Sequence, residues 1–246
     1  MDRNVNIISG ITLSGKSHLL EQILSLPEYQ GSVVIRMDDI RKRYWGERDG
    51  QSLTPSERVY RNLLTFREIE TKLIIDGAST IFVEVPMLTR LHHQQPLVKI
   101  IYEAERYVRA IEQERVYMEN SSVLERITKV NLNVVLLYCS VATADSRLKR
   151  RQNEVNTSNT DIFSLDNFLD ITLQFELPDL TTYLPLPLNT SDENLEVQHQ
   201  RLEEAVSYFH GNSPDVNIIK KRLEEAEYYL EEARSLARQH GFGNSL

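Results

Sequence analysis

Short apolar runs along the chain alternate with longer segments in which apolar residues recur every three or four positions. The short runs are typical of buried strands, and the longer segments are typical of amphipathic helices. The five runs predicted as strands are residues 5–8, 32–36, 80–85, 133–139 and 183–188. Pro185 and Pro187 lie in the last run, and we place that strand at an edge because proline cannot donate to a ladder. The alternation predicts an α/β fold with a doubly wound, five-stranded, mainly parallel sheet.

Capping residues as well as periodicity mark a helix that begins near residue 54. Thr54 is a predicted N-cap, Pro55 suits the first helical position, and Glu57 closes a capping box. The same helix is predicted to end at Gly77, a glycine that follows its last turn. The side chains expected to face the core are Val59, Leu63, Phe66 and Leu73. Further helices are predicted over residues 18–24, 142–152, 165–175 and 194–209.

Residues 97–130 are long for a crossover between two strands, so we predict a helical insertion there. One helix is expected over residues 97–120, followed by a break at residues 121–122 and a helical continuation through Val130. The residues expected on one face of the first helix are Ile100, Ala104, Tyr107 and Ile111. The segment is predicted to form either a helical hairpin or an extended arm.

Residues 215–246 are predicted to carry one more amphipathic helix, after a turn at residues 211–214. Its apolar stripe consists of Ile219, Leu223, Ala226, Leu230, Ala233 and Ala237. We expect the stripe to pack against the body of the protein or to mediate self-association with a second copy. A membrane-surface helix fits less well, since the polar face is rich in glutamate. Residues 1–210 are predicted to form a single α/β domain.

Composition and charge narrow the class of protein. The formal net charge of −8 argues against extended nucleic-acid binding, which needs a basic surface. One local exception is a cluster of basic residues after the second strand: Arg36, Arg41, Lys42, Arg43 and Arg48. No apolar run approaches membrane-spanning length, and the chain enters a predicted strand directly, so we expect neither a membrane protein nor a signal peptide. The one cysteine, Cys139, excludes an internal disulfide and fits a cytoplasmic location.

The first strand and helix enclose the phosphate-binding pattern G-x-x-x-x-G-K-S, formed by Gly10, Gly15, Lys16 and Ser17. Glycines allow the backbone to bend there, and the helix N-terminus presents N–H groups to an anion. Lys16 is expected to reach the β- and γ-phosphates of a nucleotide, and Ser17 to be a ligand of Mg²⁺. The residues predicted to bind the nucleotide are Gly10, Ile11, Thr12, Leu13, Ser14, Gly15, Lys16, Ser17 and His18.

Charged residues follow the carboxyl ends of three other predicted strands. Asp38 and Asp39 follow the second strand, and Glu84 lies at the end of the third. The arginines Arg147, Arg150 and Arg151 come soon after the fourth strand. Ligands of doubly wound sheets bind at this edge, so carboxylates and arginines are expected to meet at a bound triphosphate. Phosphoryl transfer needs this combination, because its catalysis is mainly positioning and charge neutralisation.

These motifs together resemble the polynucleotide-kinase and zeta-toxin-like group of P-loop kinases, over residues 4–200. The matching features are the phosphate loop, the D-D-I-R of residues 38–41, and the R-x-x-x-R of residues 147–151. The resemblance implies an ATP- and Mg²⁺-dependent kinase in which Asp38 accepts the proton of the substrate hydroxyl. It implies that Arg41 contacts the substrate and that Arg147 and Arg151 reach the phosphates from a lid over residues 142–165. Glu84 would contact the substrate or order Mg²⁺ through water.

The sequence also departs from that group. Leu13 replaces an inner glycine of the loop and is expected to narrow it, and His18 replaces a threonine. The residues after Glu84 lack the D-x-N-L pattern of polynucleotide kinases. The main prediction is therefore a kinase of a small molecule, nucleoside or sugar nucleotide. An ATP-dependent switch or partner-binding module is the first alternative, and a polynucleotide 5′-hydroxyl kinase is the second.

Each candidate residue also has an ordinary structural explanation. An aspartate at position 38 that served only as an N-cap or turn residue would look the same in the sequence. Arg41 would look the same if it only formed a surface salt bridge. Arg147 and Arg151 would have the same spacing on a solvated helix face.

Overall fold

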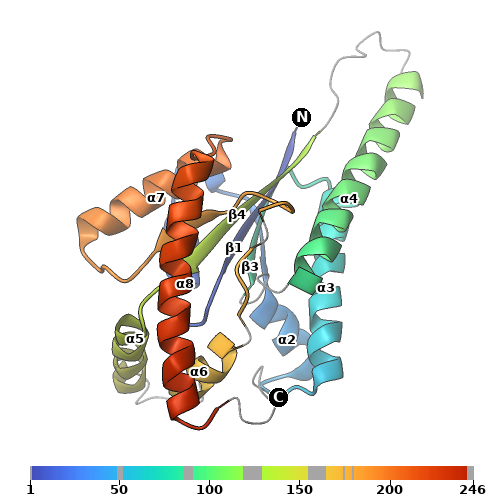
Figure 1. The fold of residues 1–246 in the computed structure, drawn as a ribbon. Coiled ribbons are helices and arrows are strands. Elements are labelled where there is room, and N and C mark those ends of the chain that lie inside the picture. The colour runs from blue at the N-terminus through green and yellow to red at the C-terminus, as the bar shows by residue number, and fades with distance from the viewer. Residues whose placement is uncertain are drawn as a thin grey trace.

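The computed structural model describes residues 2–48, 52–85, 91–118, 129–154, 165–173, 175–178 and 180–242. Its centre is a five-stranded sheet in the order β2-β3-β1-β4-β5, and every pair of neighbours is parallel. The strands are β1 (Arg3–Gly10), β2 (Val33–Arg36), β3 (Thr80–Val85), β4 (Val130–Tyr138) and β5 (Leu186–Asn189). The predicted doubly wound α/β fold is confirmed (Figure 1). The proline-containing strand lies at an edge, as predicted.

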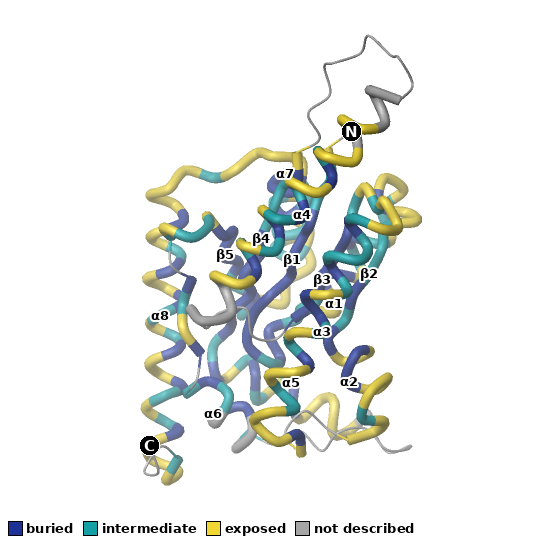
Figure 2. The backbone as a smooth tube through the Cα atoms, turned by 90° about the vertical axis from the view of Figure 1, so that its right-hand side faces the viewer, coloured by how far each residue is buried: buried dark blue, intermediate teal, exposed yellow. Residues whose placement is uncertain are grey.

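Helices cover both faces of this sheet, as a parallel sheet requires. They are α1 (Lys16–Leu24), the 3₁₀ turn η1 (Pro27–Tyr29), α2 (Met37–Trp45), α3 (Pro55–Ile74), α4 (Leu91–Met118), α5 (Val141–Glu154), α6 (Leu165–Leu173), α7 (Leu195–Phe209) and α8 (Val216–Gln239). Three hydrophobic clusters result: one under α2, α3 and α4, one under α1 and α7, and one among α5, α6 and α8. Figure 2 shows the central strands as the most buried part of the chain.

Two side-chain amide pairs join the central strands β1 and β4. The Asn131 side-chain amide donates to the Asn4 amide oxygen over 3.0 Å, and Asn133 donates to Asn6 over 2.8 Å. Both pairs coincide with the strand register, and Asn6 is completely buried. The amides therefore satisfy each other inside an otherwise apolar layer.

The predicted start of α3 is confirmed, but its predicted inner face is half wrong. The Glu57 N–H donates to the Thr54 hydroxyl, and the Thr54 N–H donates to the Glu57 carboxylate, which completes the capping box. Val59 and Leu63 are exposed. The residues buried instead are Arg61, Thr65, Phe66, Ile69 and Leu73. Two polar side chains belong to the inner face, and the apolar pattern alone therefore indicated a face that is rotated around the helix from the buried one.

The inner face of α4 also differs from the prediction. Its buried residues include Leu97, Ile101, Ala104 and Val108. The predicted face shares only Ala104 with this set, and Tyr107 and Ile111 are exposed. Both sets have helical spacing, so periodicity could not choose between them.

The helix also starts earlier than expected and carries Pro96 inside it. Its far end extends beyond the sheet (Figure 1). Val130, predicted to continue the helix, opens β4 instead. The predicted break at 121–122 and the helical continuation at 123–127 lie outside the described residues, as do residues 155–164 of the predicted lid.

The apolar stripe of α8 is buried along its whole length. The helix contacts α6, β5 and α5, and its outer side is exposed (Figure 2). The stripe therefore packs against the body of the protein, which is the first of the two predicted roles. Among the helices that the structure describes, none combines the length and apolar character needed to cross a membrane.

Candidate functional site

The loop between β1 and α1 folds into the conformation that its glycines permit. A Cβ at Gly10 would lie 2.2 Å from the Leu137 carbonyl oxygen, so the close approach of β1 to β4 requires glycine there. Gly15 has a left-handed φ of 87° and is the N-cap of α1. Leu13 is the one described non-glycine residue with a positive φ, at 67°. The loop thus turns sharply twice before it enters the helix.

The N-terminus of α1 is open to an anion. Its N-cap makes no side-chain hydrogen bond, and its first turn contains no acidic residue. The first N–H groups of a helix need an acceptor, and a phosphate supplies one while also meeting the positive end of the helix dipole. The loop and helix therefore fit the phosphate groups of a nucleotide.

Lys16 lies at the same helix end and is partly buried. Its ammonium group donates to the Ile11 carbonyl over 2.8 Å. Burial lowers the pKa of Lys16 to about 8, although the charges of Glu84 and Asp38 act to raise it. The two predicted carboxylates are therefore close enough to act on Lys16. A bound phosphate would add to their effect and favour the charged lysine.

Ser17, Glu84 and Arg36 form a chain of polar contacts across three elements. The Ser17 hydroxyl donates to Glu84 Oε1 over 2.6 Å, and Arg36 Nε lies 3.3 Å from Glu84 Oε2. Strand register accounts for the second contact, because Arg36 and Glu84 are paired residues of β2 and β3.

A hydroxyl and a carboxylate are oxygen ligands of the kind that Mg²⁺ prefers. Among the described residues, no three acidic, histidine or cysteine side chains form a cluster that could hold a metal ion alone. Mg²⁺ usually takes few protein ligands and completes its shell with substrate phosphates and water, so Ser17 and Glu84 fit it.

Asp38 lies in the first turn of α2, and Arg41 lies one turn later. Asp38 is 77% exposed, whereas Arg41 is only 3% exposed, and Arg41 Nε lies 3.6 Å from Asp38 Oδ1. The N-cap of α2 is Arg36, so Asp38 is not the capping residue. The burial of Arg41 also sets it apart from an ordinary surface ion pair. The geometry leaves the Asp38 carboxylate accessible and holds a guanidinium behind it.

Arg147 of α5 is held by four acceptors on two other segments. It donates to the Leu13 carbonyl over 2.8 Å, to the Thr190 carbonyl over 2.6 Å and hydroxyl over 3.2 Å, and to Glu193 over 2.8 Å. These bonds tie α5 to the phosphate loop and to the segment between β5 and α7. Arg147 is therefore not part of a solvated helix face.

Arg151 lies one turn further along α5 and is exposed. It lines a cavity of about 380 Å³ together with residues of the loop, α1 and α7. Its charge contributes to the lowered pKa of Lys16. Arg151 therefore faces the loop.

The two departures in the loop have identifiable contacts. The Leu13 side chain is 4% exposed and belongs to the hydrophobic cluster of α5, α6 and α8. His18 Nε2 lies 3.2 Å from Gln198 Oε1 on α7. Leu13 and His18 therefore link the loop and α1 to neighbouring helices. Cys139, also buried beside the loop, has its pKa raised to about 11 by burial, which suits an unreactive packing thiol.

Arg61, Thr190 and Glu193 are not among the residues that the sequence predicts for the site. Arg61 lies on the buried face of α3, and its i+4 and i+8 spacing to Thr65 and Ile69 was the available signal. Thr190 and Glu193 follow the edge strand, and no spacing in the sequence pairs them with Arg147.

The sequence matches no known protein family and no curated protein. Three solved structures are similar in fold. A Chloroflexus aurantiacus protein classed as a kinase has a TM-score of 0.54 at 10% identity, over 86% of this chain and 98% of its own. A sugar kinase from Janibacter sp. has a TM-score of 0.53 at 13% identity, over 85% of this chain and 95% of its own. Chaetomium thermophilum Kti12, solved with ADP-AlF3, has a TM-score of 0.51 at 12% identity, over 82% of this chain and 97% of its own. At these identities the similarity establishes the fold alone, a doubly wound α/β fold that this chain shares with the two kinases and with Kti12.

Proposed function

We propose that the protein is an ATP- and Mg²⁺-dependent phosphotransferase that moves the γ-phosphate to a hydroxyl of a small molecule, nucleoside or sugar nucleotide. One observation carries this proposal. Lys16, the Ser17–Glu84 pair and Asp38 lie at the carboxyl ends of three adjacent strands, close enough for Glu84 and Asp38 to act on the Lys16 charge. In this proposal a phosphate-binding cation, metal-ligand oxygens and an exposed carboxylate act together at that edge of the sheet.

Each group has a role in this proposal. ATP supplies the phosphoryl group, and Mg²⁺ neutralises phosphate charge when bound. Lys16 holds the β- and γ-phosphates, while the Ser17 hydroxyl and Glu84 provide oxygens for the metal and its water. Asp38 accepts the proton of the acceptor hydroxyl as that oxygen bonds to phosphorus and the bond to ADP breaks.

The arginines complete the proposed site. Arg151, which is exposed and lines the cavity beside the loop, contacts the transferred group. Arg147 positions the loop through its bonds to Leu13 and Thr190, and it would contact phosphate only by exchanging one of those acceptors. Arg41 contacts the acceptor behind Asp38.

The names of the similar structures support a kinase, since one is a sugar kinase and another is a complex with ADP-AlF3. The D-D-I-R and R-x-x-x-R motifs further support the polynucleotide-kinase and zeta-toxin-like group within P-loop kinases. The net charge of −8 favours a small acceptor over a polynucleotide.

The test is transfer of label from γ-labelled ATP in the presence of a small-metabolite pool. The parent protein should label an acceptor, and Asp38→Asn should lower that rate by about a hundredfold or more while it still binds ATP. Lys16→Ala should lose both nucleotide binding and transfer. The neighbouring Asp39, also exposed on α2, offers a matched control, and Asp39→Asn should transfer at the parent rate.

Two results would refute this assignment. Transfer by Asp38→Asn at the parent rate would remove the proposed role of Asp38. Label that passes from the parent protein only to water, across all pools tested, would favour the nucleotide-dependent switch.

A further inference from the structure

Arg61 of α3 is a buried guanidinium without an acidic partner among the described residues. It is 9% exposed, and its Nε is buried with no hydrogen-bond acceptor. Its one acceptor in the described part of the chain is the Asn62 side-chain oxygen, at a long 3.5 Å. Buried guanidinium groups ordinarily carry several hydrogen bonds, because an arginine has five N–H donors and remains charged. The described protein groups therefore leave Arg61 under-satisfied.

The surroundings of Arg61 are positively charged apart from Asp38. Burial lowers the pKa of Arg61; the charge of Asp38 opposes this, while the charges of Arg58 and Arg41 add to it. Arg41 and Arg58 are held by protein groups: Arg41 by Asp38 and the Arg48 carbonyl, and Arg58 by the Leu53 carbonyl. The charges of two further arginines and one aspartate thus act on Arg61, in a chain whose net charge is −8.

Such an arrangement costs stability unless something compensates it. A buried charge without a partner is unfavourable, and folded proteins normally pair it or replace it. Residues that destabilise the free protein are typical of binding sites, where the ligand supplies the missing contacts. An oxyanion would supply the contacts that Arg61 lacks, because a guanidinium matches a carboxylate or phosphate with two parallel hydrogen bonds.

We infer that Arg61 anchors an oxyanion subsite beside Asp38, and that the acceptor is therefore an anionic hydroxyl compound, bearing a carboxylate or a phosphate of its own. The inference rests on the proposed function for the identity of the acceptor site. The nucleotide does not account for Arg61, because its phosphates are met by the loop, α1 and α5, whereas Arg61 and Asp38 come from α3 and α2. Arg61 orients the acceptor through its charged group, while Asp38 meets its hydroxyl.

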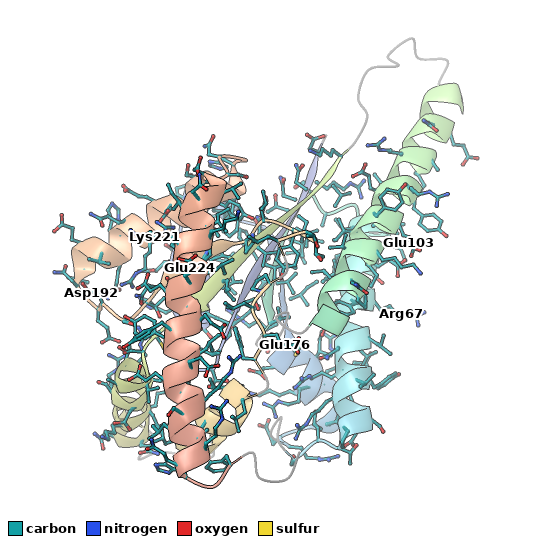
Figure 3. The ribbon with its side chains drawn as sticks, in the orientation of Figure 1. Arg67, Glu103, Glu176, Asp192, Lys221 and Glu224 are labelled. Atoms are coloured by element: carbon teal, nitrogen blue, oxygen red, sulfur yellow. The ribbon has the colours of Figure 1, made fainter. Side chains whose placement is uncertain are left out.

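The direct test is binding of inorganic phosphate and of acetate to the protein already saturated with Mg²⁺ and a non-hydrolysable ATP analogue, measured by titration calorimetry. The analogue occupies the phosphate loop, so further anion binding reports another site. The parent should bind at least one of the two anions saturably, and Arg61→Met should weaken that binding at least tenfold. Arg67, an exposed arginine of the same helix, gives the matched control, and Arg67→Met should bind like the parent (Figure 3).

Thermal unfolding separates this role from a structural one. Removal of an unpaired buried charge should leave the melting temperature of the free protein unchanged or raised in Arg61→Met. A fall of many degrees in that variant would show that Arg61 supports the fold and would overturn the inference. Absence of saturable anion binding by the parent, or equal binding by Arg61→Met, would overturn it as well.

A transfer experiment identifies the anion. The metabolite pool is divided by anion exchange, and the anionic fraction is tested before and after phosphatase treatment. Label should enter the anionic fraction; loss of labelling after treatment identifies a phosphate, and its persistence identifies a carboxylate. Labelling of the neutral fraction alone would overturn the oxyanion subsite and leave the kinase proposal intact. Anion binding at Arg61 without transfer to any acceptor would support the subsite and overturn the kinase proposal.

Discussion

Leu13 combines a left-handed backbone with a buried side chain, and these two properties have opposite effects on stability. Its φ is 67°, and its side chain packs with Ile11, Val141 and Ala144 in the cluster of α5, α6 and α8. The pair of variants Leu13→Ala and Leu13→Gly separates them. Both remove the side-chain packing, but only glycine also removes the steric cost of the left-handed conformation.

The expected magnitudes follow from the burial and the φ angle. Truncation of a fully buried leucine to alanine costs about 2–5 kcal/mol, so both variants should be less stable than the parent. A left-handed residue with a Cβ costs about 1–2 kcal/mol, whereas the added backbone entropy of glycine costs about 0.5–1 kcal/mol. Leu13→Gly should therefore be more stable than Leu13→Ala by about 0.5–1 kcal/mol, the reverse of the usual order.

Urea denaturation at 25 °C, followed by far-UV circular dichroism, measures these differences. Leu148 provides the matched control, because it is equally buried in the same cluster but lies within α5. At a helical position glycine is less stable than alanine by about 1 kcal/mol, so Leu148→Gly should unfold before Leu148→Ala. The reasoning is refuted if Leu13→Gly also unfolds at a lower urea concentration than Leu13→Ala.

The remaining predictions concern the helix cap, the loop lysine and the arginine that ties α5 to the loop. Thr54→Ala should lower the free energy of unfolding by about 1 kcal/mol in urea, while Thr54→Ser keeps the capping hydroxyl; equal losses would contradict the capping box. Because the pKa of Lys16 is about 8 and phosphates attract only its charged form, ATP affinity should fall as the pH rises from 7 to 9.5. Calorimetry at pH 9 in buffers of different ionisation enthalpy should show proton uptake on binding, and its absence would contradict the assignment. Arg147→Lys keeps the charge but loses the planar guanidinium that bonds several acceptors at once. It should lower the free energy of unfolding by about 1–3 kcal/mol and weaken ATP binding. The exposed Arg150 has one 3.4 Å contact with Glu193, so Arg150→Lys should change little in the same assays.

The fold could be predicted where local chemistry determines the structure. The glycines of the loop, the capping box at Thr54 and the apolar runs of the strands each depend on residues close in sequence. The faces of α3 and α4 could not be predicted as well, since two periodic sets of residues competed in each helix. In α3 the correct face includes Arg61 and Thr65, which a search for apolar periodicity excludes.

The site could be predicted as far as sheet topology determines it. Ser17, Asp38 and Glu84 follow strands of one parallel sheet, so a common edge was a consequence of the fold class. The contacts of Arg147 with Thr190, and the effect of the Asp38 charge on Arg61, depend on how helices pack on that sheet. Sequence spacing contains no information on either.

The amide pairs between β1 and β4 determine how far the phosphate loop projects past its neighbours. Apolar strands tolerate a slip of two residues, because every side chain keeps its face. A slip of β1 against β4 would place the half-buried Asn133 opposite Ile8, or the buried Asn6 opposite Val135. An unpaired buried amide, as Asn6 would then be, costs about 1–3 kcal/mol. It would also move Gly10 away from Leu137, and with it the carbonyl of Leu13 that Arg147 holds. Four asparagines near the opposite end of the sheet thus fix the strand register, and through it the position of the nucleotide site.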